Sequence, residues 1–169
     1  YDYLTNKFKL GTCIIMKYLF SFLVVSALIF SENSTNAEEK LNKKIIIESN
    51  DLMKFNKSSI KLSKGVSYDL ILKNVGKLPK AAMGHNLIIL EQGNDALAFG
   101  AKLISDYGAT AANDWKPIKA GKKVLAQTKM LGPNETDTIK IKFDKKGTYH
   151  FFCSFPGHFA QMRGVIVVE

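Results

Sequence analysis

Short runs of β-branched, aromatic and aliphatic residues recur along the chain from residue 44 onward, separated by glycine and polar residues. In residues 138–143 the apolar side chains stand at every second position, as in an antiparallel strand with one buried face. Many short strands at this pace predict an all-β domain, either a sandwich or a barrel. The predicted strands are residues 44–49, 59–62, 67–74, 86–90, 124–130, 136–143, 147–153 and 164–168.

One stretch, residues 94–112, departs from this pattern. It is rich in alanine, and Leu97, Ala101 and Ile104 follow one another at roughly helical spacing. We therefore expect a short helical insert in which these three side chains pack against the rest of the domain.

The beginning of the chain has the pattern of an export signal. Met16 and Lys17 precede a largely apolar run over residues 18–30, and a polar stretch then ends at Ala37. The thirteen residues of this run, at about 1.5 Å each, are too short to cross a bilayer core of about 30 Å. Residues 16–37 are thus predicted to be a signal peptide, without stable membrane insertion after cleavage. Residues 1–15 are then an upstream extension, and residues 38–169 are the functional domain.

Charge and cysteine content narrow the function. The net charge is +9, but the lysines are scattered, which argues against nucleic acid and favours an acidic protein or an anionic membrane face. Of the two cysteines, Cys13 and Cys153, signal cleavage removes the first and leaves one unpaired thiol in an oxidising compartment. Such a thiol has to be buried or bound to a metal, so Cys153 is the first candidate for function.

A metal site is indicated by the segment that begins at Cys153. His158 and Met162 follow within ten residues, and a thiolate, an imidazole and a thioether together suit copper. Zinc is the competing metal, but a thioether is a poor zinc ligand. A second histidine is needed, and strand alternation turns His150, three residues before Cys153, toward the opposite face. This leaves His85, with the carbonyl of Gly84 as a further donor.

Three segments resemble azurins: residues 50–56, with the pattern Asn-Asp-x-Met-x-Phe-Asn; residues 78–86, with Leu-Pro-Lys-x-x-Met-Gly-His-Asn; and residues 151–162, with Phe-Phe-Cys-x-Phe-Pro-Gly-His-x-Ala-x-Met. The resemblance implies a cupredoxin-like Greek-key β-sandwich of about eight strands with a helical flap. It also implies a periplasmic electron carrier with one type 1 copper. The ligands that it implies are Gly84, His85, Cys153, His158 and Met162.

The resemblance further implies that Asn86 and the backbone N–H of Phe155 donate hydrogen bonds to the Cys153 sulfur. One departure concerns tryptophan: azurins bury one just after the His-Asn pair, where this chain has Leu87. Its single tryptophan, Trp115, falls in the flap region instead.

An electron-transfer protein, rather than an enzyme, is the leading functional hypothesis, because five ligands leave no position for a substrate. Its partners would be redox proteins such as c-type cytochromes or a copper or haem reductase. Copper storage or delivery is the alternative, and it predicts exposed clusters of Met or His. An electron-entry module of a copper oxidase or nitrite reductase would need further histidines.

A small apolar rim around His158 is the predicted docking patch for these partners. The alternative is that its residues only pack the loop. Besides Phe155, the rim residues are Met83, Pro156, Phe159 and Ala160.

Overall fold

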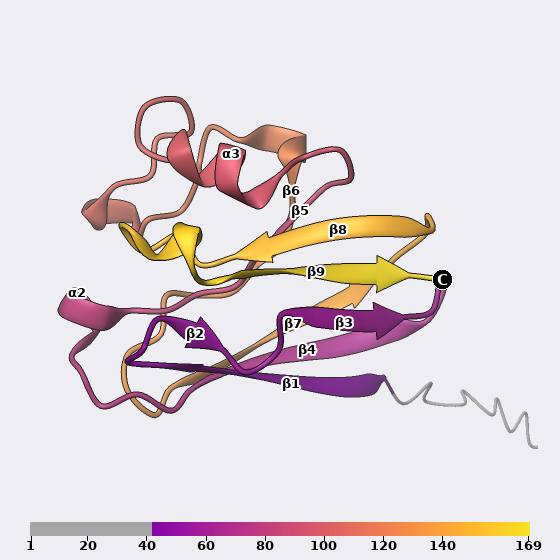
Figure 1. Ribbon diagram of the computed structural model, residues 1–169, viewed down its shortest axis with the longest axis horizontal. Coiled ribbons are helices and arrows are strands. Elements are labelled where there is room, and N and C mark those ends of the chain that lie inside the picture. Colours follow the sequence, from indigo (N-terminus) through magenta and orange to yellow (C-terminus); the bar gives the residue numbers. More distant parts are fainter. Residues whose placement is uncertain (1–41) are drawn as a thin grey trace, which may run out of the picture. The chain divides into compact units, whose positions relative to one another are not determined.

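The computed structural model describes residues 42–169, which form two β-sheets packed face to face (Figure 1). The predicted upstream extension (1–15) and signal peptide (16–37) lie outside the described residues. Within residues 42–169, no helix combines the length and the apolar character that a membrane span requires.

Each sheet mixes parallel and antiparallel neighbours. The four-stranded sheet has the order β2 (Lys54–Phe55), β1 (Lys43–Asn50), β4 (Ser67–Asn74) and β7 (Thr136–Lys142). The five-stranded sheet has the order β3 (Ser59–Leu62), β9 (Arg163–Val168), β8 (Gly147–Phe152), β5 (Ile88–Leu90) and β6 (Val124–Gln127). β1 is parallel to β4 and β3 is parallel to β9, whereas the remaining pairs are antiparallel. All eight predicted strands are present, and the structure adds the two-residue β2.

The space between the sheets is filled by the alternating apolar positions. In β7 and the residue that follows it, Ile139, Ile141 and Phe143 are buried while Lys140 is exposed, as the sequence pattern predicted. β7 pairs with β4, whose buried Tyr68, Leu70 and Leu72 belong to the same core cluster. The core receives side chains from both sheets, so the fold is a sandwich.

The helical insert is present, but the predicted packing face is wrong. Its helix is α3 (Ala96–Ala101), and Leu97 and Ile104 are 45% and 64% exposed. The stripe that is buried instead contains Phe99, whose ring stacks on Tyr107 with centroids 4.1 Å apart and also meets Phe152. The aromatic side chain buries more apolar area than Leu97 or Ile104, and it therefore determines which side of the helix faces inward. The buried stripe is Ala96, Phe99, Gly100 and Leu103.

Short helical turns gather near one end of the sandwich, away from the C-terminus (Figure 1). α2 (Lys80–Met83) precedes β5, and η3 (His158–Ala160) lies between β8 and β9. The flap, defined here as residues 94–123, contains α3, η1 (Ala111–Asn113) and η2 (Gly121–Lys123). The flap contacts the loop before β9 directly, because a Cβ on Gly100 would overlap the ring of Phe159.

Candidate metal centre

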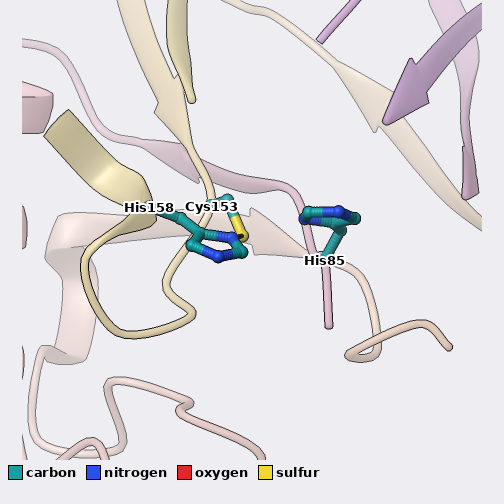
Figure 2. Close-up of side chains that lie close together, drawn as sticks. All are labelled: His85, Cys153 and His158. Atoms are coloured by element: carbon teal, nitrogen blue, oxygen red, sulfur yellow. Dashed lines mark hydrogen bonds between the residues drawn. The ribbon is translucent and has the colours of Figure 1, made fainter. Parts of the chain in front are cut away.

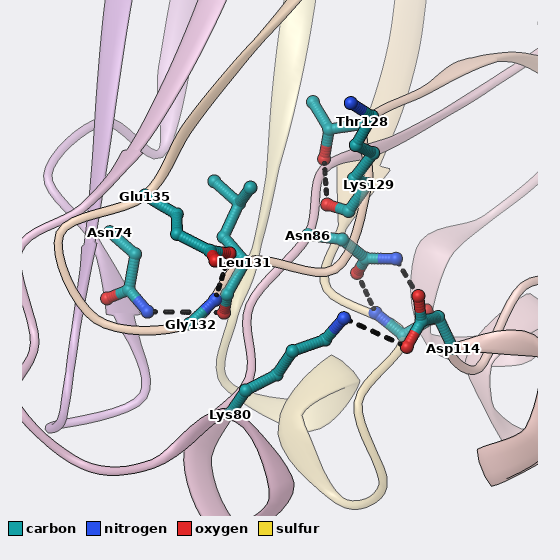
Figure 3. Close-up of polar contacts among 10 residues, drawn as sticks. Asn74, Lys80, Asn86, Asp114, Thr128, Lys129, Leu131, Gly132 and Glu135 are labelled. Atoms are coloured by element: carbon teal, nitrogen blue, oxygen red, sulfur yellow. Dashed lines mark hydrogen bonds and ion pairs between the residues drawn. The ribbon is translucent and has the colours of Figure 1, made fainter.

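His85 is fixed between α2 and β5 by its own backbone. Its N–H donates to the carbonyl of Leu131 at 3.1 Å, and the Leu131 N–H donates back to the His85 carbonyl at 2.7 Å. The preceding Gly84 allows a close approach, since a Cβ there would lie 2.8 Å from the Lys80 carbonyl oxygen. The side-chain amide of Asn74 also donates to the Leu131 carbonyl (Figure 3). The position of His85 therefore depends on a chain segment more than forty residues away.

Cys153 and His158 lie on a closed loop between β8 and β9. The N–H of Cys153 donates to the Met162 carbonyl at 2.9 Å, and the Met162 N–H donates to the His158 carbonyl at 2.7 Å. Gly157, with φ of 79°, adopts the left-handed conformation that turns the chain into η3. These bonds place the Cys153 and His158 side chains on the same side of the loop.

The three side chains meet in the interior (Figure 2). The candidate ligand atoms of His85, Cys153 and His158 all lie within 4.8 Å of one another. Cys153 Sγ is 3.7 Å from His158 Nδ1, and the two imidazole centroids are 5.1 Å apart. All three residues are buried. His150 is outside this group, because its Nδ1 accepts from the Ala96 N–H at 3.1 Å.

Burial disfavours the charged form of each of the three side chains. It lowers the pKa of His85, and burial together with the neighbouring His85 lowers the pKa of His158 to about 4. Burial also raises the pKa of the Cys153 thiol to about 11, although the N–H groups of Asn86 and Phe155 oppose this rise. Both ring nitrogens of His85 are buried without a hydrogen-bond partner among the described residues. Neutral imidazoles with unused lone pairs beside a thiol fit a soft or borderline metal ion.

Of the other two predicted ligands, Gly84 borders the same space. The carbonyl oxygen of Gly84 lies 3.9 Å from Cys153 Sγ, which points toward it. The side chain of Met162 is fully buried at the end of the loop. Gly84 is therefore next to Cys153 in space, and Met162 is tied to Cys153 and His158 by the backbone hydrogen bonds of the loop.

The side chain of Asn86 connects the two halves of the site. Its Oδ1 accepts from the Ser154 N–H and its Nδ2 donates to the Ser154 hydroxyl, both at 2.8 Å. The resemblance implies that Asn86 donates to the sulfur, and it does not reveal this bond to Ser154. The signal was present, since each of the two polar residues directly follows a candidate ligand.

The residues of the predicted docking rim differ in their exposure to solvent. Pro156 and Ala160 are exposed, whereas Met83 and Phe159 are half-buried. Phe159 packs into the gap above Gly100 of α3 and thus also serves as packing between loop and flap. A second link, which no sequence pattern indicates, is the ion pair of Lys80 in α2 with Asp114 in the flap at 3.0 Å.

Residues 41–169 match the family described as copper binding proteins, plastocyanin/azurin family. The chain belongs to this family. It is 39% identical over 127 residues to azurin of Alcaligenes faecalis, covering 72% of this chain and 94% of that protein. It is 38% identical over 125 residues to Azurin-2 of Alcaligenes xylosoxydans xylosoxydans, covering 71% of this chain and 92% of that protein.

Solved structures of the plastocyanin/azurin type share the fold. The azurin Az-iso2 of Methylomonas sp. strain J superposes with a TM-score of 0.64 at 27% identity, covering 76% of this chain and 99% of that one. Reduced auracyanin of Roseiflexus castenholzii gives 0.63 at 28% identity, covering 76% and 98%. These relatives confirm the predicted resemblance and the cupredoxin fold. Together with the His–Cys–His cluster, they identify a blue copper electron-transfer protein whose cofactor is copper.

Proposed function

We propose that this protein shuttles single electrons between redox proteins in the periplasm and is not an enzyme. We further propose that the side chains of His85, Cys153, His158 and Met162, with the carbonyl of Gly84, hold one copper ion. When bound, copper supplies a one-electron couple between Cu(II) and Cu(I). The observation that carries the proposal is the buried group of two imidazoles and a thiol, in which the His85 nitrogens have no protein partner among the described residues.

The protein's own residues prepare this site for a cation. Low pKa values keep His85 and His158 neutral near pH 7, so their lone pairs are available. Cys153 has to give up its proton when the metal binds, because a thiolate is the ligand form. The N–H groups of Asn86 and Phe155 then stabilise the negative charge on the sulfur.

The framework around the site supports fast electron exchange. His85 is held by two backbone bonds to Leu131, and Cys153 and His158 are held by the closed loop. Asn86 and Ser154 join these two segments. Because the donor groups are held by backbone bonds rather than by mobile side chains, little has to rearrange when an electron arrives or leaves.

Burial argues against catalysis and against storage. His85 and Cys153 are fully buried and His158 is 3% exposed, which leaves no open approach for a substrate molecule. Storage would need exposed and exchangeable ligands. Among the described residues, a single group of three or more metal-binding side chains is present, and it is buried.

Location and partners follow from the sequence. The predicted signal peptide (16–37) supports a periplasmic location, and the net charge of +9 supports acidic redox partners, such as c-type cytochromes or a copper or haem reductase. The docking patch is the rim formed by Met83, Pro156, Phe159 and Ala160, with electrons passing through the His158 ring. The exposure of Pro156 and Ala160 supports this use of the rim.

Loading with copper(II) and recording the visible spectrum tests the proposal. The expected result is an intense blue band from thiolate-to-copper charge transfer. Cys153→Ser should abolish the band, and His85→Ala should abolish or displace it. The matched control is His150→Ala, which changes the histidine outside the cluster and should keep the band. A colourless Cu(II) complex, or an unchanged band in Cys153→Ser, would contradict the ligand assignment.

A further inference from the structure

A series of aromatic contacts leads from the metal cluster to the surface of the flap. The His158 and Phe155 rings have centroids 4.7 Å apart at an interplanar angle of 41°. Phe155 in turn meets the edge of Trp115, with centroids 6.4 Å apart. The Phe155 N–H also opposes the high pKa of the Cys153 thiol. Trp115 is therefore connected to the cluster through a single intervening side chain.

The backbone around Trp115 holds a costly conformation. Asp114 and Trp115 are both left-handed, with φ of 56° and 57°, although neither is glycine. The turn is maintained by the ion pair of Asp114 with Lys80 and by the Trp115 N–H, which donates to the Thr110 carbonyl at 2.8 Å. Such strain persists only where surrounding contacts enforce it, and here it directs the indole toward Phe155.

Trp115 lines two surface hollows. One, of about 140 Å³, lies between the flap and the loop that joins β8 to β9, and is bordered by Ala101, Ile104 and Pro156. The other, of about 380 Å³, includes Ala111 and Phe155. The largest exposed apolar side chain beside them is Ile104, at 64%. We call this apolar area the flap face and define it as Ala101, Ile104, Ala111 and Trp115.

The charges near the flap face are predominantly positive. Lys80 is paired with Asp114, and Lys102 is paired with Asp106 at 3.9 Å. Lys116 follows Trp115 directly and has no ion-pair partner among residues 42–169. With a net charge of +9 on the chain, an apolar area beside an unpaired lysine suits a partner with an acidic surface.

We propose that the flap face is a second electron-exchange surface, at which an acidic redox protein docks and an electron crosses Trp115 and Phe155 to the metal cluster. This inference rests on the proposed electron-transfer function and adds a route through Trp115, on a surface that adjoins the rim at Pro156. One electron leaves the reduced partner and one arrives at the site. Neither aromatic ring is oxidised or reduced, and no proton moves.

The apoprotein gives a first test that does not depend on the metal. Trp115 is the single tryptophan of the chain, so its fluorescence reports on the flap face alone. Iodide should quench it more strongly than caesium does, by at least about twofold after calibration against N-acetyltryptophanamide. Lys116→Glu should remove this difference, whereas the matched change Lys140→Glu, on the exposed side of β7, should leave it. Equal quenching by the two ions would overturn the proposal.

The same fluorescence separates other occupants of the face. A shift of Trp115 emission to shorter wavelength on adding anionic phosphatidylglycerol vesicles would assign the face to a membrane. A shift that depends on protein concentration would assign it to a second copy of this chain. Either result would overturn the proposal, which expects no shift in both experiments.

Intramolecular electron transfer tests the route in the copper-loaded protein. A photoactive ruthenium complex is attached to a histidine introduced by Ala111→His, beside Trp115, or by Thr148→His, on the exposed side of β8. Trp115→Leu should slow transfer from the first label several-fold, and Trp115→Phe should slow it less. Transfer from the second label should not change in either variant. The blue band should remain in both, which shows that they fold.

An unchanged rate from the label at position 111 in Trp115→Leu would overturn the route. If the label at position 148 still exchanges electrons with a blue site, the proposed function stands even though the flap route has failed. If neither label exchanges electrons with the site, the proposed function itself fails.

Discussion

Asn86 and Ser154 bind each other in both directions, with the Asn86 amide accepting from the Ser154 N–H and donating to its hydroxyl at 2.8 Å in each case. Both residues are buried, and each directly follows a residue of the metal cluster. The distance between His85 and Cys153 is thus controlled by a pair of side chains that do not themselves have to touch the metal.

Replacing Asn86 by Ala should lower the free energy of unfolding of the apoprotein by about 2 to 4 kcal/mol, because it leaves a buried N–H and a buried hydroxyl without partners. Ser154→Ala should cost less, since it removes one hydrogen bond and keeps the backbone one. Urea denaturation of the two apoproteins measures the difference. Equal losses would contradict the importance of the bond to the Ser154 N–H.

The sequence predicts those features of the fold that depend on interactions between residues close together in the chain. β3, β4 and β7 could be located to within a residue because their buried side alternates locally. β6 was expected to reach Met130 but ends at Gln127, where the Thr128 hydroxyl accepts from the Leu87 N–H in place of regular pairing. No local sequence pattern predicts that a side-chain hydroxyl replaces a backbone carbonyl as the acceptor of this hydrogen bond.

The metal cluster was predictable for a different reason: the chain has few residues with the required chemistry. One cysteine and three histidines lie in the predicted domain, and strand alternation removed one histidine. The ion pair of Lys80 with Asp114 could not be predicted in this way, because the chain has many lysines and the two residues are far apart in the sequence. The prediction of which side of α3 is buried was wrong, because the helix has two apolar stripes and only packing against Phe152 decides between them.

The apoprotein should lose stability in mildly acidic solution. Burial and His85 lower the pKa of His158 to about 4, from 6.5 in an unfolded chain. Between these values the unfolded chain binds more protons than the folded one, so the free energy of unfolding falls as the pH falls. The loss between pH 7 and pH 5 should be about 2 kcal/mol. Denaturation of the apoprotein at both pH values, compared with His158→Phe, provides the measurement, and the variant should lose part of this dependence, because burial also lowers the pKa of His85, which remains. Identical dependence in both proteins would contradict the assignment to His158.

His150→Ala should leave the blue band in place but make the protein less stable. The imidazole Nδ1 accepts from the Ala96 N–H, at the start of α3, and this bond is lost. A cost of about 1 kcal/mol is expected for one partly buried hydrogen bond. Absorption and thermal unfolding of the same sample test both parts. Loss of colour in a folded variant would mean that His150 belongs to the cluster.

Ala160→Asp should slow electron self-exchange while leaving the spectrum nearly unchanged. An unpaired carboxylate buried at a small interface costs about 1 to 3 kcal/mol, and about 1.4 kcal/mol corresponds to tenfold in affinity. Line broadening in NMR spectra of mixed oxidised and reduced protein gives the rate. Arg163 donates to the Ala160 carbonyl and therefore lies near the new acid, so Ala160→Lys is the necessary control and should also slow exchange. Parent-like rates in both variants at equal ionic strength would place electron exchange on another face.

The absence of a side chain at Gly100 makes the structure of the loop between β8 and β9 depend on the flap. Phe159 occupies the notch that this glycine leaves, so a larger residue there would push the loop away from the sandwich. Transplanting residues 153–162 alone onto another cupredoxin would carry Phe159 without its notch. Loop exchange between family members should therefore succeed best when α3 is transferred together with the loop.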